Sequence, residues 1–136
     1  MEEVLSKIKT RVGDDPVRLG LILGSGLGHL AASVDGTAID YSDLPGFPHA
    51  GVSGHSPKLV IGKLEGVQVA VFGGRAHYYE TGDPKAMRLP LEVLKGLGAE
   101  QLLLTNAAGS LRDGMPPGEL MLRSANLNYS GMHHMV

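Results

Sequence analysis

The chain has 136 residues, 43% hydrophobic and 19% charged, which is ordinary for one soluble globular domain with a proper core. A formal net charge of −2 gives no electrostatic reason to expect a nucleic-acid partner, and the lack of cysteine excludes disulfides and thiolate metal sites. The charged amino terminus is unlike a signal peptide and no apolar run approaches the roughly 20 residues that span a bilayer, so we predict a single cytoplasmic domain, residues 1–136, with no membrane partner.

The amino-terminal third alternates helix and strand patterns. Residues 4–12 place apolar side chains on one helix face, and Gly13 marks the end of that helix. Residues 18–23 are an apolar run with the length and composition of a buried parallel strand. The apolar segment 27–34 predicts the start of a helix, and residues 37–41 predict another strand.

The middle of the chain predicts a hairpin that follows a long loop. Residues 44–57 contain too much glycine and proline for regular structure, and a loop of this length in a compact domain is usually functional or mobile. Residues 58–64 and 67–72 have strand patterns, and Glu65-Gly66 between them is a good two-residue hairpin turn.

The last third predicts one helix and two strands. Asp83-Pro84 has the chemistry of an N-cap and a first helical residue, and the helix ends near Gly96–Gly98, with a kink expected at Pro90. Residues 101–105 predict a buried strand and residues 119–123 a final one. Strands with intervening helices favour an α/β domain with a partly parallel sheet, whose ligands bind at the carboxyl ends of the strands.

The turn after the first strand, GSGLG at residues 24–28, has the chemistry of an anion site. Its glycines expose backbone N–H groups, and a following helix would point its N-terminus at the same place. The known glycine motifs fit poorly, because His29 replaces a glycine of the dinucleotide fingerprint and leucines flank Ser25 where a nucleophile elbow needs glycines. A tight strand-to-helix turn without a ligand is the alternative interpretation.

The loop FGGRAHYYETGDP, residues 72–84, carries a second set of donors. Arg75, His77 and Tyr79 alternate, so they project from one side of an extended backbone. Arginine offers a two-pronged fork for phosphate, and the two preceding glycines leave room for a ligand. The alternative is a strand edge with a solvated polar face.

The motifs GSGLG, GHS, GRAHYYE and TNAAGS, in this order, resemble those of the trimeric purine nucleoside phosphorylases. The resemblance runs from about residue 18 to about residue 122, and GRAHYYE and TNAAGSL carry most of its weight. It implies a three-layer α/β sandwich around a mixed, partly parallel sheet, incomplete in this chain, which corresponds to the amino-terminal half of the family's chains. Methylthioadenosine-type phosphorylases share that fold and stay a substrate alternative, although the H-Y-Y-E stretch is more similar to the purine nucleoside branch.

The resemblance also implies a reaction. A purine (deoxy)ribonucleoside and inorganic phosphate give the free purine and pentose 1-phosphate, as in purine salvage, with no metal or organic cofactor and with a homotrimer as the assembly. Phosphorolysis passes through an oxocarbenium-like state, so the protein must place a phosphate dianion more than supply a nucleophile. Ser25 is then an anion ligand and not an attacking group.

Residue roles follow from the same resemblance. It implies four phosphate ligands, namely Ser25, His55, Arg75 and the backbone N–H of Ala107. His77 is implied as the catalytic residue between phosphate and pentose, Tyr79 contacts the sugar hydroxyls, and Ala108 and Gly109 lie along the nucleoside.

Residues 124–136 depart from the family pattern. Where the family reads close to S-D-H-I-N, this chain reads S-A-N-L-N, so Asn126 replaces the histidine. Adjacent His133 and His134 are a poor pair of metal ligands, so no metal site is predicted there. By resemblance, the residues that read the purine lie beyond the matched half, which leaves a truncated, inactive phosphate-binding or assembly fragment as an alternative. A dinucleotide-binding oxidoreductase domain is disfavoured by the glycine spacing.

Overall fold

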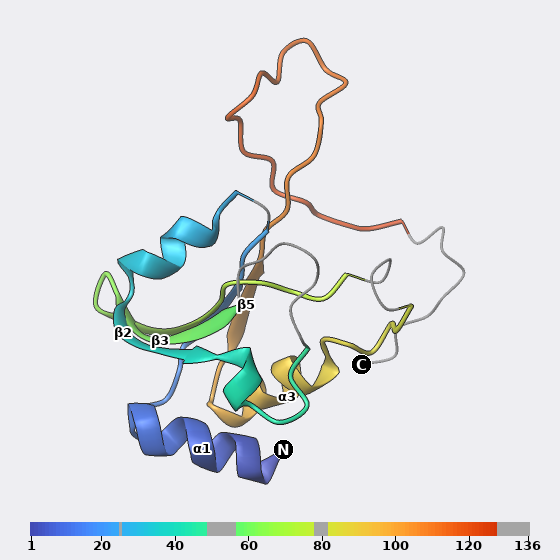
Figure 1. Ribbon diagram of the computed structural model, residues 1–136. Helices are drawn as coiled ribbons and strands as arrows, with labels where there is room; N and C mark the ends of the chain where they lie inside the picture. The colour runs from blue at the N-terminus through green and yellow to red at the C-terminus, as the bar shows by residue number, and fades with distance from the viewer. Residues whose placement is uncertain (25, 49–56, 78–81, 128–136) are drawn as a thin grey trace.

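A computed structural model of the chain describes residues 1–24, 26–48, 57–77 and 82–127 (Figure 1). Its elements in chain order are α1 (Glu2–Val12), β1 (Leu19–Ile22), η1 (Gly28–Ser33), β2 (Asp35–Asp40), η2 (Tyr41–Asp43), β3 (Lys58–Leu64), β4 (Val67–Phe72), α3 (Arg88–Gly96) and β5 (Gln101–Leu104), where η denotes a 3-10 helix. Within these residues, no helix is long and apolar enough to cross a membrane.

The strands form one mixed sheet of five strands in the order β2-β3-β4-β1-β5. β1 lies parallel to β4 on one side and to β5 on the other, whereas β3 runs antiparallel to both of its neighbours, β2 and β4. The β3–β4 hairpin turns through Glu65 and Gly66, whose φ angles of 49° and 79° are both in the left-handed region that such a turn needs. The predicted hairpin and the predicted partly parallel sheet are both confirmed.

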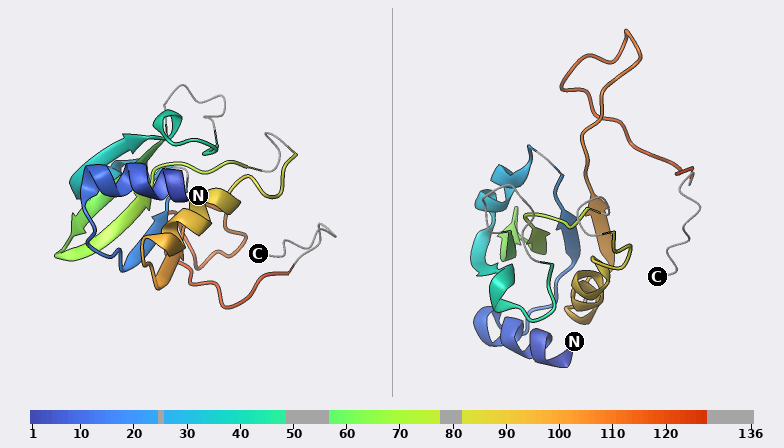
Figure 2. Two further views of the ribbon diagram at one scale, coloured as in Figure 1. Left: turned by 90° about the horizontal axis from the view of Figure 1, so that it is seen from below. Right: turned by 45° about the vertical axis from the view of Figure 1, so that its right-hand side comes forward.

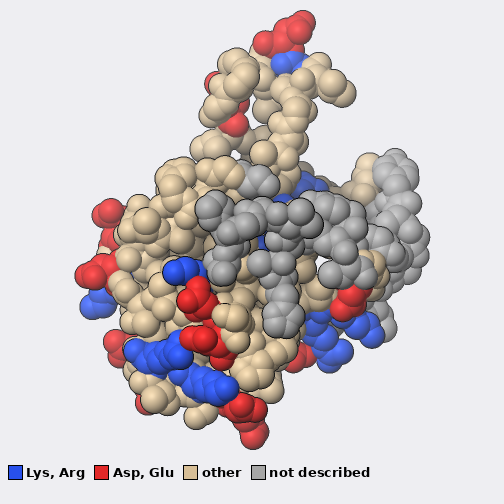
Figure 3. Space-filling model, viewed as in Figure 1, with Lys and Arg blue, Asp and Glu red and all other residues tan. Residues whose placement is uncertain are grey.

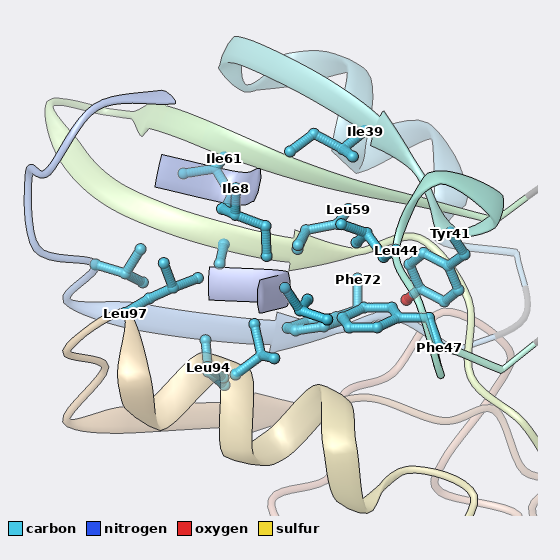
Figure 4. Close-up of a cluster of buried hydrophobic side chains, with 14 of the residues drawn as sticks. Ile8, Ile39, Tyr41, Leu44, Phe47, Leu59, Ile61, Phe72, Leu94 and Leu97 are labelled. Atoms are coloured by element: carbon cyan, nitrogen blue, oxygen red, sulfur yellow. The ribbon is translucent and has the colours of Figure 1, made fainter. Parts of the chain in front are cut away.

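One face of the sheet carries the larger hydrophobic core. Side chains that alternate along the strands point to this face and pack against α1, α3 and η2 (Figure 4), with Ile22, Leu59, Ile61, Ala70 and Phe72 from the sheet. Tyr41 and Phe47 contact each other edge to face, with ring centroids 5.1 Å apart, and both lie against Phe72.

The opposite face carries a smaller core under η1. Its buried members are Leu21, Leu23, Val34, Val60, Val69 and Val71. Figure 1 shows α1 and α3 below the sheet and η1 above it, and the two further views in Figure 2 agree. The predicted three-layer arrangement is confirmed, with a short 3-10 helix as the third layer where residues 27–34 had predicted the start of a helix.

The start predicted for the helix in the last third of the chain, at Asp83-Pro84, is wrong. α3 begins at Arg88, and Asp83 instead accepts a hydrogen bond through Oδ1 from the backbone N–H of Lys85 (2.8 Å). The aspartate therefore stabilises a turn, a use of its side chain that competes with helix capping. Pro90 lies in the first turn of α3, where its missing N–H removes no intrahelical hydrogen bond, so the reason for a kink there disappears.

The sheet ends at β5, and two sequence predictions fail there. The sequence predicts a buried strand, but Leu102, Leu103 and Leu104 are 42%, 46% and 62% exposed, because β5 is an edge strand. Residues 119–123 do not form a strand. The described chain beyond β5 leaves the sheet and runs as an extended loop with exposed side chains (Figure 1).

Candidate active site

Three loops meet at one edge of the sheet. β4, β1 and β5 are parallel neighbours, so their carboxyl ends lie side by side at that edge. The turn at Gly24 follows β1, the loop with Arg75 follows β4, and the segment from Thr105 follows β5. This is the position where open α/β sheets bind their ligands.

Thr105 accepts one hydrogen bond and donates another that connect the first and third of these loops. The backbone N–H of Gly24 donates to Thr105 Oγ1 at 2.8 Å, and the Thr105 N–H donates to the carbonyl of Ile22 at 3.1 Å. Gly24 also has to be glycine at this place. A Cβ there would lie 2.6 Å from the carbonyl oxygen of Thr105 and 2.9 Å from Cα of Asn106.

Arg75 joins the second loop to the third. Its Nη1 donates to the carbonyl oxygen of Thr105 at 2.7 Å, and the side chain is half-buried. A guanidinium has five N–H donors in a planar fork. One hydrogen bond to the protein therefore orients the group and leaves other N–H donors available for a ligand. The arrangement holds a permanent positive charge beside the turn at Gly24.

The loop that carries Arg75 is itself anchored. Gly73 donates its N–H to the carbonyl of Lys58 at 2.8 Å, and the hydroxyl of Tyr41 donates to the carbonyl of Gly74 at 2.8 Å. Tyr41 is buried, and burial raises the pKa of its hydroxyl above the ordinary range for tyrosine, so that it remains a neutral donor. The backbone on the amino-terminal side of Arg75 is therefore fixed from the core.

The described part of the chain brings some of the predicted site residues to this edge. Arg75 lies in the junction with Gly24 and Thr105, and His77 follows it half-buried on the same loop. Ala107, Ala108 and Gly109 follow Thr105 and are exposed. A final group lies outside the described residues: Ser25, His55, Tyr79, His133 and His134.

Thr105 and Tyr41 are two residues of the site that sequence reasoning missed. Each makes its contact through a hydroxyl, Thr105 to Gly24 and Tyr41 to Gly74. For Thr105 a signal was present, since a hydroxyl residue directly ends an apolar strand and opens the motif TNAAGS. For Tyr41 there was none, because its partner lies 33 residues away on another loop.

On one face of the molecule (Figure 3), the charges of the described residues are mixed. On the face in Figure 3, basic and acidic side chains of the described residues lie intermingled over the lower part of the molecule. An ion pair between Arg11 and Asp43 (2.8 Å) joins α1 to η2. Such exposed pairs contribute little to stability, and they contrast with the half-buried Arg75 at the sheet edge.

A family model described as the phosphorylase superfamily matches residues 18–134. The chain belongs to the phosphorylase superfamily. The resemblance found in the sequence is thereby confirmed, and the junction of Gly24, Arg75 and Thr105 lies within the matched residues.

Relatives of this chain within the superfamily include purine nucleoside phosphorylases. Purine nucleoside phosphorylase 1 of Geobacillus stearothermophilus is 42% identical over 137 residues, which cover 100% of this chain and 50% of that protein. Purine nucleoside phosphorylase 1 of Bacillus subtilis is 39% identical, with the same coverage of 100% and 50%. The chain thus spans about half the length of the curated relatives it matches.

Solved phosphorylases share the fold. The crystal structure of purine nucleoside phosphorylase from Schistosoma mansoni in complex with acetate matches with a TM-score of 0.74 and 40% identity, over 85% of this chain and 42% of that one. The structure of the same enzyme in complex with inosine matches with a TM-score of 0.73 and 38% identity, over 85% and 40%. The phosphorylase-like fold is therefore confirmed, as one part of a larger fold.

Proposed function

We propose that this chain is the phosphate- and pentose-binding half of a purine nucleoside phosphorylase. The observation that carries the proposal is the junction at the carboxyl edge of β4, β1 and β5, where Arg75 is held beside the glycine turn by the carbonyl of Thr105. An oriented guanidinium next to backbone N–H groups suits a tetrahedral oxyanion. Relatives named purine nucleoside phosphorylase support the identity of that anion as inorganic phosphate.

The proposed reaction needs this anion in a fixed place. An oxygen of phosphate forms a bond to the anomeric carbon of the nucleoside while the bond from that carbon to the purine nitrogen breaks. The purine leaves with the electron pair and takes up a proton. Positive charge develops on the sugar in the transition state, so a phosphate dianion held beneath it both stabilises that charge and captures the carbon.

The roles of individual residues are part of the proposal. Phosphate is bound by Ser25, His55, Arg75 and the backbone N–H of Ala107. His77 lies between phosphate and pentose and is the catalytic residue, and Tyr79 binds the sugar hydroxyls. Ala108 and Gly109 leave room along the nucleoside, because neither has a bulky side chain. The co-substrate is inorganic phosphate and no cofactor is needed.

The substrate class has support from solved relatives. Similar chains have been crystallised with inosine, with hypoxanthine and with ribose-1-phosphate, which are a nucleoside, a purine base and a pentose phosphate. These favour the purine nucleoside branch over the methylthioadenosine type for this chain. A homotrimer and a cytoplasmic location stay predictions, the first from the resemblance and the second from the sequence.

Calorimetry with inorganic phosphate tests the proposal. We expect the parent chain to bind phosphate, with an affinity that weakens as salt is added, because the contacts are charge-assisted. Arg75→Ala should weaken binding by about tenfold or more, and Arg75→Lys should weaken it less, because an ammonium keeps the charge but loses the fork. The matched control is Arg18→Ala, since Arg18 is an exposed arginine at the amino end of β1, paired with Glu100. Equal phosphate affinity in the parent and in Arg75→Ala would contradict the proposal.

A further inference from the structure

Thr105 contacts both neighbouring loops at the carboxyl edge of the sheet. Its hydroxyl accepts a hydrogen bond from the Gly24 N–H (2.8 Å) and donates a longer one to the carbonyl of Ile22 (3.4 Å). Its own N–H also donates to the carbonyl of Ile22 (3.1 Å), and its carbonyl accepts from Arg75 (2.7 Å). One residue thus makes three hydrogen bonds to the end of β1, through its hydroxyl and its N–H, and a fourth to the β4 loop through its carbonyl.

The hydroxyl is used in a way that few side chains can reproduce. The hydroxyl accepts a hydrogen bond from the N–H of Gly24 and donates one to the carbonyl of Ile22, so its oxygen must act as both donor and acceptor. Threonine is also branched at Cβ, so its χ1 angle is restricted and the hydroxyl is held in place before any ligand arrives. Valine has the same shape and lacks both functions. It would leave the half-buried Gly24 N–H without the acceptor it has now.

Arg75 depends on the same residue through the main chain. The carbonyl of Thr105 accepts a charge-assisted hydrogen bond, a strong and directional interaction that aims the guanidinium. The hydroxyl fixes where Thr105 lies relative to β1, and the carbonyl then fixes where Arg75 lies relative to Thr105. The spacing between the glycine turn and the guanidinium is therefore set by one residue.

We propose that Thr105 is a positioning residue, which presets the Gly24 turn and the Arg75 guanidinium to bind one oxyanion between them. Thr105 acts through these two neighbours and does not need to touch the anion. The identity of the anion as inorganic phosphate rests on the function proposed above. The hydrogen-bonded junction itself does not, so its integrity can be measured without any ligand.

Two hydroxyl-free variants and two controls test this inference in the full chain. Thr105→Val keeps the shape and removes the hydroxyl, and Thr105→Ala is a second hydroxyl-free variant that is read in the same way. Thr105→Ser restores the hydroxyl. Thr10→Val is the matched control, because the Thr10 hydroxyl makes one hydrogen bond of 2.8 Å to the carbonyl of Ser6 in α1, away from the site. All variants are measured well below their unfolding temperatures.

Two readouts are needed, amide hydrogen exchange at Gly24 and calorimetry with inorganic phosphate. In the hydroxyl-free variants we expect exchange of the Gly24 amide to accelerate about tenfold and the Kd for phosphate to rise about tenfold. Thr105→Ser should stay within about twofold of the parent in both, and Thr10→Val should change neither. Loss and rescue together separate positioning from a general loss of stability, which Thr10→Val also probes.

Three results would overturn the inference. Unchanged Gly24 exchange in the hydroxyl-free variants means that the hydroxyl does not hold the turn. Unchanged phosphate affinity in them, with the parent binding phosphate, means that the junction does not position the site. Equal losses in Thr105→Ser and Thr105→Val mean that the hydroxyl is not the cause. If the parent itself binds no phosphate, the proposed function fails, and slow Gly24 exchange that depends on the Thr105 hydroxyl still supports the junction.

Discussion

The hydroxyl of Tyr41 donates to the carbonyl of Gly74 at 2.8 Å, so the residue next to Arg75 is tied to the larger hydrophobic core. Tyr41 packs there against Phe47 and Phe72 with its ring, while its hydroxyl reaches the loop after β4. A single side chain thereby connects core packing with the candidate phosphate site.

Removing this hydroxyl should lower stability. Tyr41→Phe keeps the ring contacts but leaves the Gly74 carbonyl without its donor, which should cost about 1–2 kcal/mol in the free energy of unfolding. Urea denaturation of the two proteins measures the difference. Phosphate affinity should fall less than in Arg75→Ala, since the guanidinium keeps its bond to Thr105. A variant as stable as the parent would show that the bond to Gly74 contributes nothing.

The same residue predicts a loss of stability at alkaline pH. An unfolded tyrosine loses its proton near about pH 10, whereas burial raises the pKa of Tyr41 in the folded chain. Below that pH both the folded and the unfolded chain hold the tyrosine proton, and the contribution of Tyr41 to the free energy of unfolding is fully present. Above it the unfolded state alone deprotonates, so the free energy of unfolding falls as pH rises.

Subtracting the unfolding free energy of Tyr41→Phe from that of the parent separates the effect of Tyr41 from the effects of other groups that titrate in the same pH range. The difference in unfolding free energy between parent and variant should shrink as the pH is raised through the pKa of unfolded tyrosine. A difference that stays constant across this range contradicts a raised pKa for Tyr41.

Gly24 and Gly28 offer a matched pair of glycine substitutions. A Cβ at Gly24 would lie 2.6 Å from the carbonyl of Thr105, whereas a Cβ at Gly28 meets nothing within 4 Å. Gly24→Ala should therefore destabilise the chain by about 1–3 kcal/mol and weaken phosphate binding, because the turn must move away from Thr105. Gly28→Ala should be close to neutral in both. Thermal unfolding and calorimetry measure the two effects, and equal behaviour of the variants contradicts the close approach.

The edge strand β5 should promote self-association. Leu102, Leu103 and Leu104 are exposed on a strand whose outer edge is unpaired within the described residues, a combination that favours edge-to-edge pairing. We expect the purified chain to form oligomers or aggregates that grow with concentration in light scattering. Leu103→Lys should reduce them, whereas Leu111→Lys, a fully exposed leucine beyond β5, should have less effect. A clean monomer at every concentration argues against this role of β5.

The 136-residue chain alone should not phosphorolyse purine nucleosides at a rate typical of the family. The chain spans about half the length of its relatives, and the resemblance puts the residues that read the purine outside that half. Losing a single preorganised donor to a developing anion costs about a hundred- to a thousandfold in rate, and loss of the whole base site should cost more. A coupled assay of hypoxanthine release from inosine, with and without phosphate, measures this. Phosphate-dependent turnover by a verified 136-residue chain would be the contrary result.

Features with a local cause could be predicted from the sequence. The β3–β4 hairpin follows from strand patterns on both sides of Glu65-Gly66, because this dipeptide adopts the two left-handed conformations that the turn requires. α1 follows from helical periodicity, since one of its faces is buried. β1 follows from its continuous apolar run, since both of its faces are buried. The order of GSGLG, GRAHYYE and TNAAGS was sufficient to predict the superfamily, which the family model confirms.

Predictions failed where a local signal has two uses. Asp83 has the chemistry of a helix cap and instead closes a turn on Lys85, and both uses satisfy one backbone N–H. Leu102–Leu104 has the composition of a buried strand, but burial depends on a neighbour on each side, and β1 is the one neighbour in the described sheet. The composition of a segment indicates which of its side chains favour burial, but it does not indicate whether another part of the protein covers them.

By itself, the sequence determined most of the elements, the donors available for an anion and the superfamily, because these depend on residue types at short range or on motif order. The tertiary structure decided which donors meet. Gly24 and Thr105 are 81 residues apart, and Arg75 and Thr105 are 30 apart. They come together because β1 lies between β4 and β5 in a parallel arrangement, so the three carboxyl ends share one edge. Strand order is set by the packing of the whole sheet, so the residues around Thr105 do not predict that β1 lies between β4 and β5.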